Sequence, residues 1–278
     1  MQSHVSGECP LHVYLAASSD TQIPLMTDFV GGITGVDARM SVVPDGELDG
    51  VVSREKREPA EMIVLERGEG TTREHISRVA LNSPVPVMVL PPCGDAGYPS
   101  LSRLLVPLDG SDRAAQALPL AKHIAMGAGL PVYFVMVIDP SRVIPPAFAY
   151  DPDAWMIVSE LRETAHWALR QAETSLRQAG VNVESDLLFG PVNASIQNVL
   201  RPSDLIVMTT HGSGKKRSTL GSVAERVLAS AAGPVIVIRG TEPGDVVVDG
   251  YEACSWVEPL SRRATTTLAS AGAVAGGD

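Results

Sequence analysis

The chain has 278 residues, of which 45% are hydrophobic and 4% aromatic, and it carries a formal net charge of −10. This length suffices for two domains of ordinary size. The diffuse acidic charge argues against a nucleic-acid-binding surface, which needs a basic stripe.

Two further classes are disfavoured. The three cysteines, Cys9, Cys93 and Cys254, lie far apart and lack CxxC spacing, which argues against a disulfide framework and a zinc site. No apolar run approaches the roughly 18 residues of a membrane span, and the first residues lack the basic and apolar regions of a signal peptide. We therefore expect a cytoplasmic protein with no membrane and no nucleic acid among its partners.

The first 92 residues contain four short apolar runs that predict strands, with a helix after the first of them. The runs are HVYLAASSD (12–20), ARMSVVP (38–44), EMIVLERGEG (61–70) and VPVMVLPP (85–92), and the helix is expected at about residues 21–34. The Pro- and Gly-rich segment PPCGDAGYPS (91–100) follows and predicts a linker.

Residues 101–240 alternate between apolar runs and segments with helical spacing. Strands are predicted at 103–110, 131–139, 181–190, 204–210 and 234–240, and helices at 112–128, 153–179, 191–202 and 221–232. Ser111 or Asp112 is expected to cap the first helix, and Gly180 to end the long one. This alternation predicts an α/β fold with a parallel five-stranded open sheet and helices on both of its faces.

The two parts of the chain match in pattern. Residues 12–20 parallel 103–112, residues 61–70 parallel 204–214, and residues 85–92 parallel 233–240. The first part has one strand candidate where the second has two, so it has lost about one β-α element. We predict tandem repeats at 11–92 and 101–240, the first one shortened, and a partly disordered C-terminal tail at 241–278.

The segment THGSGKKRSTLGSVAERV (210–227) follows a buried strand and opens a helix. It is not a P-loop, because G-x4-G-K-[ST] would need glycine at Thr209 and Ser or Thr at Lys216. A dinucleotide fingerprint fails as well, since G-x-G-x-x-G would need glycine at Arg217. The segment nevertheless lies at the end of a strand, where open α/β sheets bind their ligands.

Two interpretations of this segment stay open. Gly212 and Gly214 allow close backbone approach, the basic residues 215–217 raise the local potential, and the Gly221–Ser222 pair at a helix N-terminus favours phosphate. Together they predict a polyphosphate cradle. Alternatively, Ser222 and Glu225 have the S-x-x-E spacing of a capping box, and the basic residues are a solvated loop.

The segment VPLDGSD (106–112) also ends a predicted strand. Asp109 is therefore expected in the same crevice as the 212–222 loop, where its carboxylate can accept hydrogen bonds from ribose hydroxyls or from a base amino group. The alternative is that Asp109 is only a turn former at the start of a helix. Ser111 and Asp112 already cover the capping role.

Together these segments resemble the universal stress protein family. LLVPLDGSD, the VIDP end of the second strand, and THGSGKKRSTLGSVAERVLASAAGPVIVIRG match it in order and spacing over about residues 101–240. The resemblance implies the Rossmann-like fold of adenine nucleotide alpha hydrolases, with ATP as ligand and Mg²⁺ bridging its phosphates. The site residues that it implies are Pro107, Leu108, Asp109, Val137, Met208, Thr209, His211, Gly212, Gly214, Gly221, Ser222 and Val223.

The resemblance also implies roles and exposes departures. Asp109 would contact adenine or ribose, Val137 and Met208 would line the adenine pocket, and residues 212–223 would hold the phosphates and ribose. Nucleotide-binding members carry G-x2-G-x9-G-[ST], whereas here Thr209 replaces the first glycine. Only eight residues separate Gly212 from the glycine of the final pair. These departures bear on affinity more than on fold.

Some side chains have a second interpretation. His211 at the loop entry could contact a phosphate or be an ordinary turn histidine. Phe148 and Tyr150, in the Pro-rich loop before the long helix, could cover an adenine face. Trp155 and Trp167 on that helix are expected to be packing residues.

The first repeat lacks the corresponding site residues. Ala17 aligns with Asp109, and Arg73 and Glu74 occupy the positions of the Gly221–Ser222 pair when the repeats are aligned on their last strands. A glutamate there would repel phosphate. We expect that the first repeat binds no ATP and serves as a dimer-like partner.

The sequence thus predicts a universal stress protein that binds ATP in its second repeat and acts through nucleotide-dependent association with a regulatory protein. No general base or activated nucleophile is identifiable, so any ATPase activity is expected to be weak. The alternatives are a scaffold that binds no nucleotide and a slow ATP hydrolase. The last strand would pair with another copy in a homo-oligomer or, in a pseudo-dimer, with the internal repeat.

Overall fold

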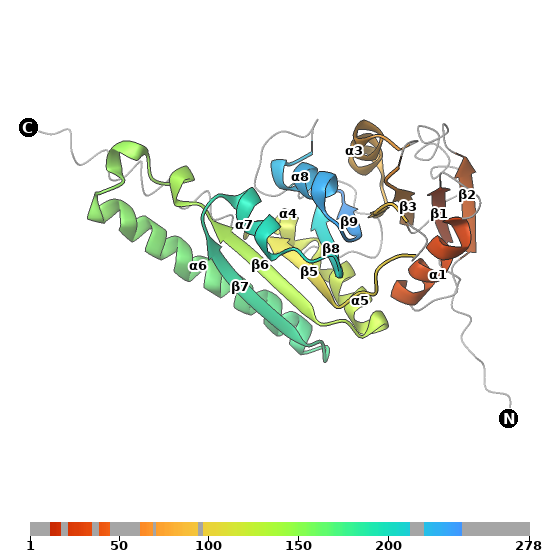
Figure 1. Ribbon diagram of the computed structural model, residues 1–278. Coiled ribbons are helices and arrows are strands. Elements are labelled where there is room, and N and C mark those ends of the chain that lie inside the picture. Colours follow the sequence, from red (N-terminus) through yellow and green to blue (C-terminus); the bar gives the residue numbers. More distant parts are fainter. Residues whose placement is uncertain are drawn as a thin grey trace, which may run out of the picture.

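The computed structural model describes residues 12–17, 22–34, 39–44, 62–68, 71–93, 97–211 and 220–240. The strands in these ranges form one nine-stranded sheet in the order β2-β1-β3-β4-β9-β8-β5-β6-β7 (Figure 1). The predicted C-terminal tail, 241–278, lies outside the described residues.

The described elements follow the alternation expected from the sequence. Up to residue 93 they are β1 (His12–Ala17), α1 (Gln22–Thr34), β2 (Arg39–Pro44), β3 (Met62–Glu66), α3 (Arg73–Asn82) and β4 (Val87–Leu90). From residue 97 they are β5 (Arg103–Leu108), α4 (Asp112–Ala115), α5 (Leu118–Ala128), β6 (Val132–Ile138), the short 3₁₀ turns Pro140–Arg142 and Pro146–Phe148, α6 (Pro152–Arg177), β7 (Val183–Phe189), α7 (Val192–Val199), β8 (Asp204–Thr209), α8 (Ser222–Ser230) and β9 (Val235–Ile238).

Strand direction divides the sheet at one place. Every neighbouring pair of described strands is parallel except β4 and β9, which pair antiparallel through Val87↔Val237, Met88↔Ile236 and Val89↔Val235. On one side of this pair the order is β9-β8-β5-β6-β7. On the other side β4-β3-β1-β2 follows the same order without an outermost strand. The edge of β9 is therefore already occupied by the chain's own β4.

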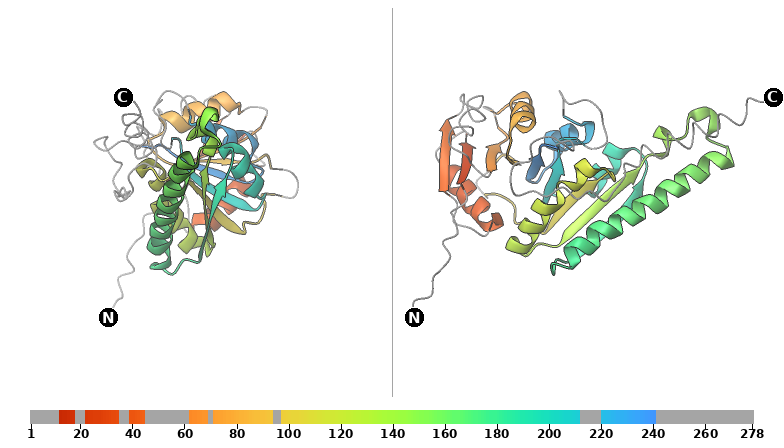
Figure 2. Two further views of the ribbon diagram at one scale, coloured as in Figure 1. Left: turned by 90° about the vertical axis from the view of Figure 1, so that its left-hand side faces the viewer. Right: turned by 180° about the vertical axis from the view of Figure 1, so that it is seen from behind.

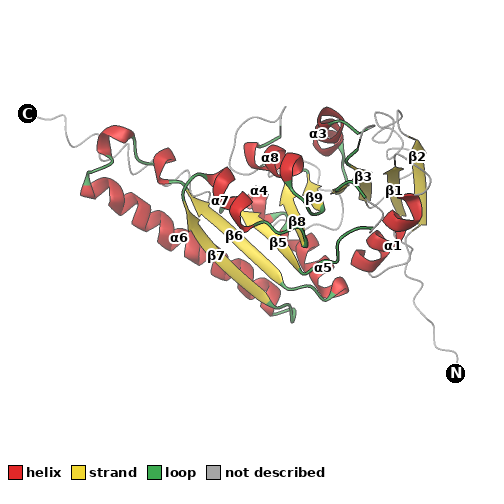
Figure 3. Cartoon of the chain, viewed as in Figure 1, coloured by secondary structure: helices red, strands yellow, loops and turns green. Residues whose placement is uncertain are grey.

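Helices cover both faces of the sheet. Buried side chains of α1, α5 and α6 pack on one face, and those of α3, α7 and α8 pack on the other. The central strands β3, β4 and β8 are buried along their whole length, which is why they read as continuous apolar runs. The long helix α6 lies along β6 and β7, far from the first strands (Figures 2 and 3). The predicted α/β fold with a mostly parallel open sheet is confirmed.

Some helix boundaries differ from the prediction. Ser111 caps α4, since its Oγ accepts a hydrogen bond from the N–H of Ala114 at 3.1 Å. The single helix expected at 112–128 is two helices, because Pro119 has no N–H and its ring would clash with the carbonyl of Ala115. α6 ends at Arg177, and Gly180 follows with φ +81°.

The aromatic side chains of the long helix are less buried than expected. Trp155 and Trp167 are 47% and 42% exposed. The prediction that they are packing residues is therefore wrong for the exposed part of each side chain. Phe148 and Tyr150 are also exposed. The indole N–H of Trp155 donates to the carbonyl of Ala149 at 2.9 Å, which ties the loop to the start of α6.

Candidate nucleotide site

The sheet changes its winding direction between β5 and β8. The chain passes from β5 to β6 on one side and from β8 to β9 on the other. These neighbours pair only through Arg103↔Asp204, Leu104↔Leu205 and Leu105↔Ile206, although β5 runs on to Leu108 and β8 to Thr209. The carboxyl-terminal halves of the two strands are therefore not paired with each other, at the point where open α/β sheets bind ligands.

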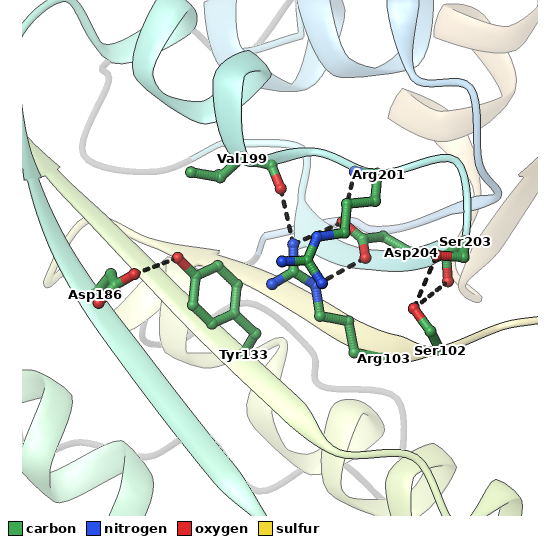
Figure 4. Close-up of polar contacts among 8 residues, drawn as sticks. All are labelled: Ser102, Arg103, Tyr133, Asp186, Val199, Arg201, Ser203 and Asp204. Carbon is green, nitrogen blue, oxygen red and sulfur yellow. Dashed lines mark hydrogen bonds and ion pairs between the residues drawn. The ribbon is translucent and has the colours of Figure 1, made fainter.

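The opposite ends of the same two strands are held together (Figure 4). The guanidinium of Arg103 pairs with the carboxylate of buried Asp204 at 2.8 and 3.1 Å, and it donates to the carbonyl of Val199 at 2.7 Å. Its Cζ lies 4.2 Å from the ring centre of Tyr133, whose hydroxyl donates to Asp186 at 2.6 Å. The bidentate Arg103–Asp204 pair fixes the register of β5 and β8 at their amino-terminal ends.

The two serines that directly precede β5 and β8 add further hydrogen bonds between these strands. Ser102 and Ser203 hydroxyls lie 2.8 Å apart, and the Ser102 N–H donates to the Ser203 carbonyl at 2.8 Å. The hydrogen bond from Arg103 to Asp204 raises the pKa of the guanidinium. Sequence reasoning missed this cluster, because an Arg and an Asp at the starts of two strands look like ordinary surface charges.

Asp109 directly follows β5 in a tight turn. Its Oδ1 accepts hydrogen bonds from the N–H of Ser111 at 3.0 Å and from the Ser111 hydroxyl at 2.5 Å. Gly110 between them has φ +77°, a conformation that favours glycine. The turn-former interpretation is therefore correct for Oδ1, and the turn also orients the carboxylate at the end of the strand.

Thr210 joins the segments that leave β8. It is fully buried, and its N–H donates to the carbonyl of Ile238 at 2.7 Å. Its hydroxyl lies 3.0 Å from Nδ1 of His211 and accepts from the N–H of Gly240 at 3.2 Å. Its carbonyl accepts from the N–H of Gly221 at 2.8 Å. Thr210, which follows β8, and Gly221, the N-cap of α8, are thus tied together at the same strand end.

Thr209, which replaces a family glycine, is also buried. Its hydroxyl donates to the carbonyl of His211 at 2.8 Å. The extra side chain is therefore used to bend the chain as it leaves β8. His211 itself contacts Thr210, which fits the turn interpretation of this histidine.

Gly221 is a position where a side chain does not fit easily. A Cβ there would lie 3.0 Å from the carbonyl oxygen of Thr210 and 3.6 Å from Cα of His211. Gly221 is the N-cap of α8 and has no side chain to form a cap hydrogen bond. The predicted capping box is wrong, because Ser222 is already the first helical residue and lies one position too far along. The first N–H groups of a helix lack intrahelical partners, so this end suits an anion.

The other predicted site residues are placed as follows. Ser222 lines a groove of about 490 Å³ together with residues of α7 and α8 and with Arg73. Val137, Met208 and Val223 pack on the face of the sheet that α7 and α8 cover, whereas Leu108 packs on the opposite face. Pro107 lies on β5, opposite Val135 of β6. Gly212 and Gly214 lie outside the described residues.

The first part of the sheet has an equivalent edge, where β1 neighbours β3. The N–H of Arg67 donates to the carbonyl of Leu90, the last residue of β4, just as that of Thr210 donates to Ile238, the last residue of β9. Glu66 and Arg67 therefore correspond to Thr209 and Thr210. α3 begins at Arg73, with Thr72 as its N-cap and Glu74 in its first turn.

Side chains and the linker fill this equivalent edge. The carboxylate of Glu66, 2% exposed, accepts from the amide of Gln22 at 3.2 Å and from the N–H of Cys93 at 2.6 Å. Tyr98 of the linker packs on Phe29 with ring centres 5.1 Å apart. Burial and the nearby Glu66 raise the pKa of both Tyr98 and Cys93. A raised pKa lowers the thiolate fraction of Cys93, and the thiolate is the nucleophilic form.

In the part of the chain that the structure describes, no group of three or more His, Cys, Asp or Glu is arranged to hold a metal ion. None of the helices found there is both long enough and apolar enough to cross a membrane.

Comparison with known proteins identifies relatives. Residues 101–239 match the family model described as the universal stress protein family. A universal stress protein of Methanocaldococcus jannaschii is 35% identical over 142 residues, which cover 49% of this chain and 81% of the relative. One of Bacillus subtilis is 30% identical over 148 residues, covering 50% and 99%. A putative universal stress protein structure from Pseudomonas aeruginosa shares the fold over 83% of each chain, with a TM-score of 0.51 and 15% identity.

Proposed function

The chain belongs to the universal stress protein family, and from this premise we propose that residues 101–240 bind ATP at the carboxyl ends of β5 and β8. The observation that carries the proposal is the early separation of these strands, with Asp109 following one and the Thr210–Gly221 contact closing the other. A base and ribose would enter between the strand ends, and the phosphates would extend toward α8.

The residues at the two sides supply complementary chemistry. Asp109, oriented by Ser111, can accept hydrogen bonds from a ribose hydroxyl or an adenine amino group. The unpaired N–H groups at the start of α8 and the positive end of its dipole favour phosphate. Gly221 leaves room where a Cβ would press on Thr210. Val137 and Met208 would form the apolar wall of the base pocket.

The remaining site residues are assigned by the same proposal. Gly212 and Gly214 would hold the phosphates, and Ser222 and Val223 would follow them at the first turn of α8. Mg²⁺ would neutralise charge between the phosphate oxygens, as it does where it is bound mainly through substrate phosphates. Thr209 does not exclude binding, because its hydroxyl is directed to the His211 carbonyl.

We also propose that the chain consists of tandem repeats at 11–92 and 101–240 that form an intramolecular pseudo-dimer. The antiparallel β4–β9 pair and the shared strand order support this division. The first repeat would bind no nucleotide, because buried Glu66 and the linker residues Cys93 and Tyr98 occupy the corresponding edge. ATP would act as a signal that alters association with a regulatory protein in the cytoplasm, with little turnover.

Calorimetric titration of the purified protein with Mg·ATP tests the proposal, with thermal unfolding as a second readout. We expect saturable binding and an unfolding midpoint that rises with ATP concentration, as ligand linkage requires. Asp109→Asn should weaken binding about tenfold, which corresponds to one charge-assisted hydrogen bond.

Asp139 offers a matched control for that substitution. At the end of β6 its Oδ1 accepts from the N–H and hydroxyl of Ser141 at 3.1 and 2.6 Å, the same turn chemistry as at Asp109. Asp139→Asn should leave ATP affinity unchanged. Absence of binding at millimolar ATP would instead indicate a scaffold, and phosphate release abolished by Asp109→Asn would indicate a hydrolase.

A further inference from the structure

Arg67 reaches from the end of β3 to the C-terminal end of α8, 161 residues away in sequence. Its Nη1 donates to the carbonyl of Leu228 at 3.3 Å, and its Nη2 donates to the carbonyl of Ala231. Both acceptors belong to the last turn and C-cap of the helix. Figure 1 shows α8 beside α3, the helix that follows β3.

This contact meets a requirement of the helix end. The last carbonyls of a helix have no intrahelical donors, and the negative end of its dipole favours a cation. The guanidinium is partly buried, and burial lowers its pKa, yet arginine stays protonated in proteins. The Arg67 backbone is fixed by its own hydrogen bond to Leu90 at 2.9 Å, so the cation is held in place by the sheet.

The other end of α8 is held by the residue that corresponds to Arg67. Thr210 accepts the N–H of Gly221 through its carbonyl, and a Cβ on Gly221 would contact that same oxygen. α8 is therefore fixed at its start by the second repeat and at its end by the first. The two anchors are the residues that directly follow β8 and β3.

We propose that Arg67 is a positioning residue through which the first repeat supports ATP binding by the second, an inference that rests on the proposed function. By capping the C-terminal end of α8, Arg67 fixes the helix so that the N–H groups at its N-terminal end point toward the phosphates. Its positive charge also interacts favourably with the negative end of the helix dipole. The first repeat thus supports, through the C-terminal end of α8, a site at the carboxyl ends of two strands of the second repeat.

Three variants separate charge, shape and fold. Arg67→Met removes the cation and keeps an apolar stem, Arg67→Lys keeps the cation, and Arg162→Met removes an exposed arginine from α6 as a control for net charge. Calorimetric titration with Mg·ATP at 25 °C should show about two- to fivefold weaker binding for Arg67→Met, the range expected for a charge at a helix terminus. Arg67→Lys should recover most of the affinity, and Arg162→Met should match the parent protein.

Thermal unfolding of each variant without nucleotide shows whether it is folded at the titration temperature. A residue with only a structural role would lower the unfolding midpoint and leave the affinity of the folded protein unchanged. Parent-like ATP affinity in folded Arg67→Met would therefore overturn the proposal, as would equal losses in the Met and Lys variants.

Amide hydrogen exchange in α8 keeps the inference testable if the parent protein binds no ATP. The N–H of Glu225 donates to the carbonyl of Gly221 at 2.9 Å in the first turn. This amide should exchange faster in Arg67→Met than in Arg67→Lys, because the uncapped helix opens along its whole length. Faster exchange confined to the last turn would overturn the positioning role. Failure of ATP binding in the parent alone would overturn only the proposed function.

Discussion

The two halves of the sheet share a strand order but end their central strands differently. β1 and β3 stay paired through Ala16↔Leu65, one residue before each strand ends. β5 and β8 stop pairing at Leu105↔Ile206, three residues before their ends. The first edge is closed by backbone pairing and by the Glu66 contacts, whereas in the described part of the second edge the last three residues of the two strands are not paired with each other.

This difference shows that two halves with the same strand order can differ at the carboxyl ends of their inner strands. The last residue of the inner strand and the residue after it are Glu66 and Arg67 in one half and Thr209 and Thr210 in the other. The acidic residue binds the chain's own Gln22 and linker N–H, and the basic residue caps the neighbouring half's helix. In the described part of the chain, the two threonines bind nearby backbone and His211, and these contacts fix the shape of the edge.

The largest expected effect concerns the residue two positions before the last strand of each half. Pro86 and Pro234 are equivalent, because their carbonyls accept from Ile63 and Ile206, each at 3.0 Å. Val85 thus corresponds to Gly233, but a Cβ at Gly233 would lie 2.4 Å from the carbonyl oxygen of Asp204. Gly233→Ala should lower the unfolding free energy by about 3 kcal/mol, measured by urea denaturation.

Gly31 in α1 is the matched control for that substitution. A Cβ there would meet nothing within 4 Å, and alanine suits a helix interior better than glycine. Gly31→Ala should therefore raise the unfolding free energy by about 0.5 kcal/mol. A Gly233→Ala protein as stable as the parent would show that the backbone around Asp204 yields more easily than the fixed Arg103 pair implies.

A smaller effect is expected when the second half is given the first half's residue. Thr209→Glu places at the end of β8 the kind of carboxylate that Glu66 supplies at the end of β3. Like-charge repulsion should weaken ATP binding about tenfold or more, roughly 1.4 kcal/mol, in calorimetric titration. Thr209→Val, which keeps the shape and loses only the hydroxyl, separates charge from packing. Parent-like affinity in Thr209→Glu would place the phosphates elsewhere.

The sequence predicted the strands of both halves because buried parallel strands are continuous apolar runs flanked by turns. It also predicted that Asp109 and the residues after β8 share one edge, which follows from strand direction alone. The break at Pro119 could have been predicted as well, since proline removes a helical hydrogen bond. The N-cap residue of α8 could not have been predicted. The S-x-x-E pattern points to Ser222 as the N-cap, and the close contact of Gly221 with Thr210 is visible only in the fold.

The contacts that distinguish the halves are non-local, which explains why they were missed. Arg67 and Leu228 are 161 residues apart, and Thr210 and Gly240 are 30 apart. Glu66 and Cys93 lie 27 residues apart on either side of a helix and a strand. Neither hydrophobic periodicity nor a short motif predicts contacts between residues so far apart. A single sequence shows only the residue types, and these fit many other arrangements.

The smallest expected effect is a pH dependence that compares buried Tyr133 of β6 with partly buried Tyr98 of the linker. Burial and the hydrogen bond to Asp186 raise the pKa of Tyr133 to about 12. The unfolded chain loses this proton near pH 10, so the folded state binds more protons above that pH. The stabilisation is complete below about pH 10 and is lost as the pH rises toward 12. Between pH 8 and 11 the unfolding free energy of the parent should fall about 1 kcal/mol further than that of Tyr133→Phe.

Tyr98→Phe should differ from the parent in the same direction, because burial and Glu66 also raise the pKa of Tyr98. Parallel pH curves for Tyr133→Phe and the parent would mean that the Tyr133–Asp186 hydrogen bond does not hold the phenol proton in the folded protein.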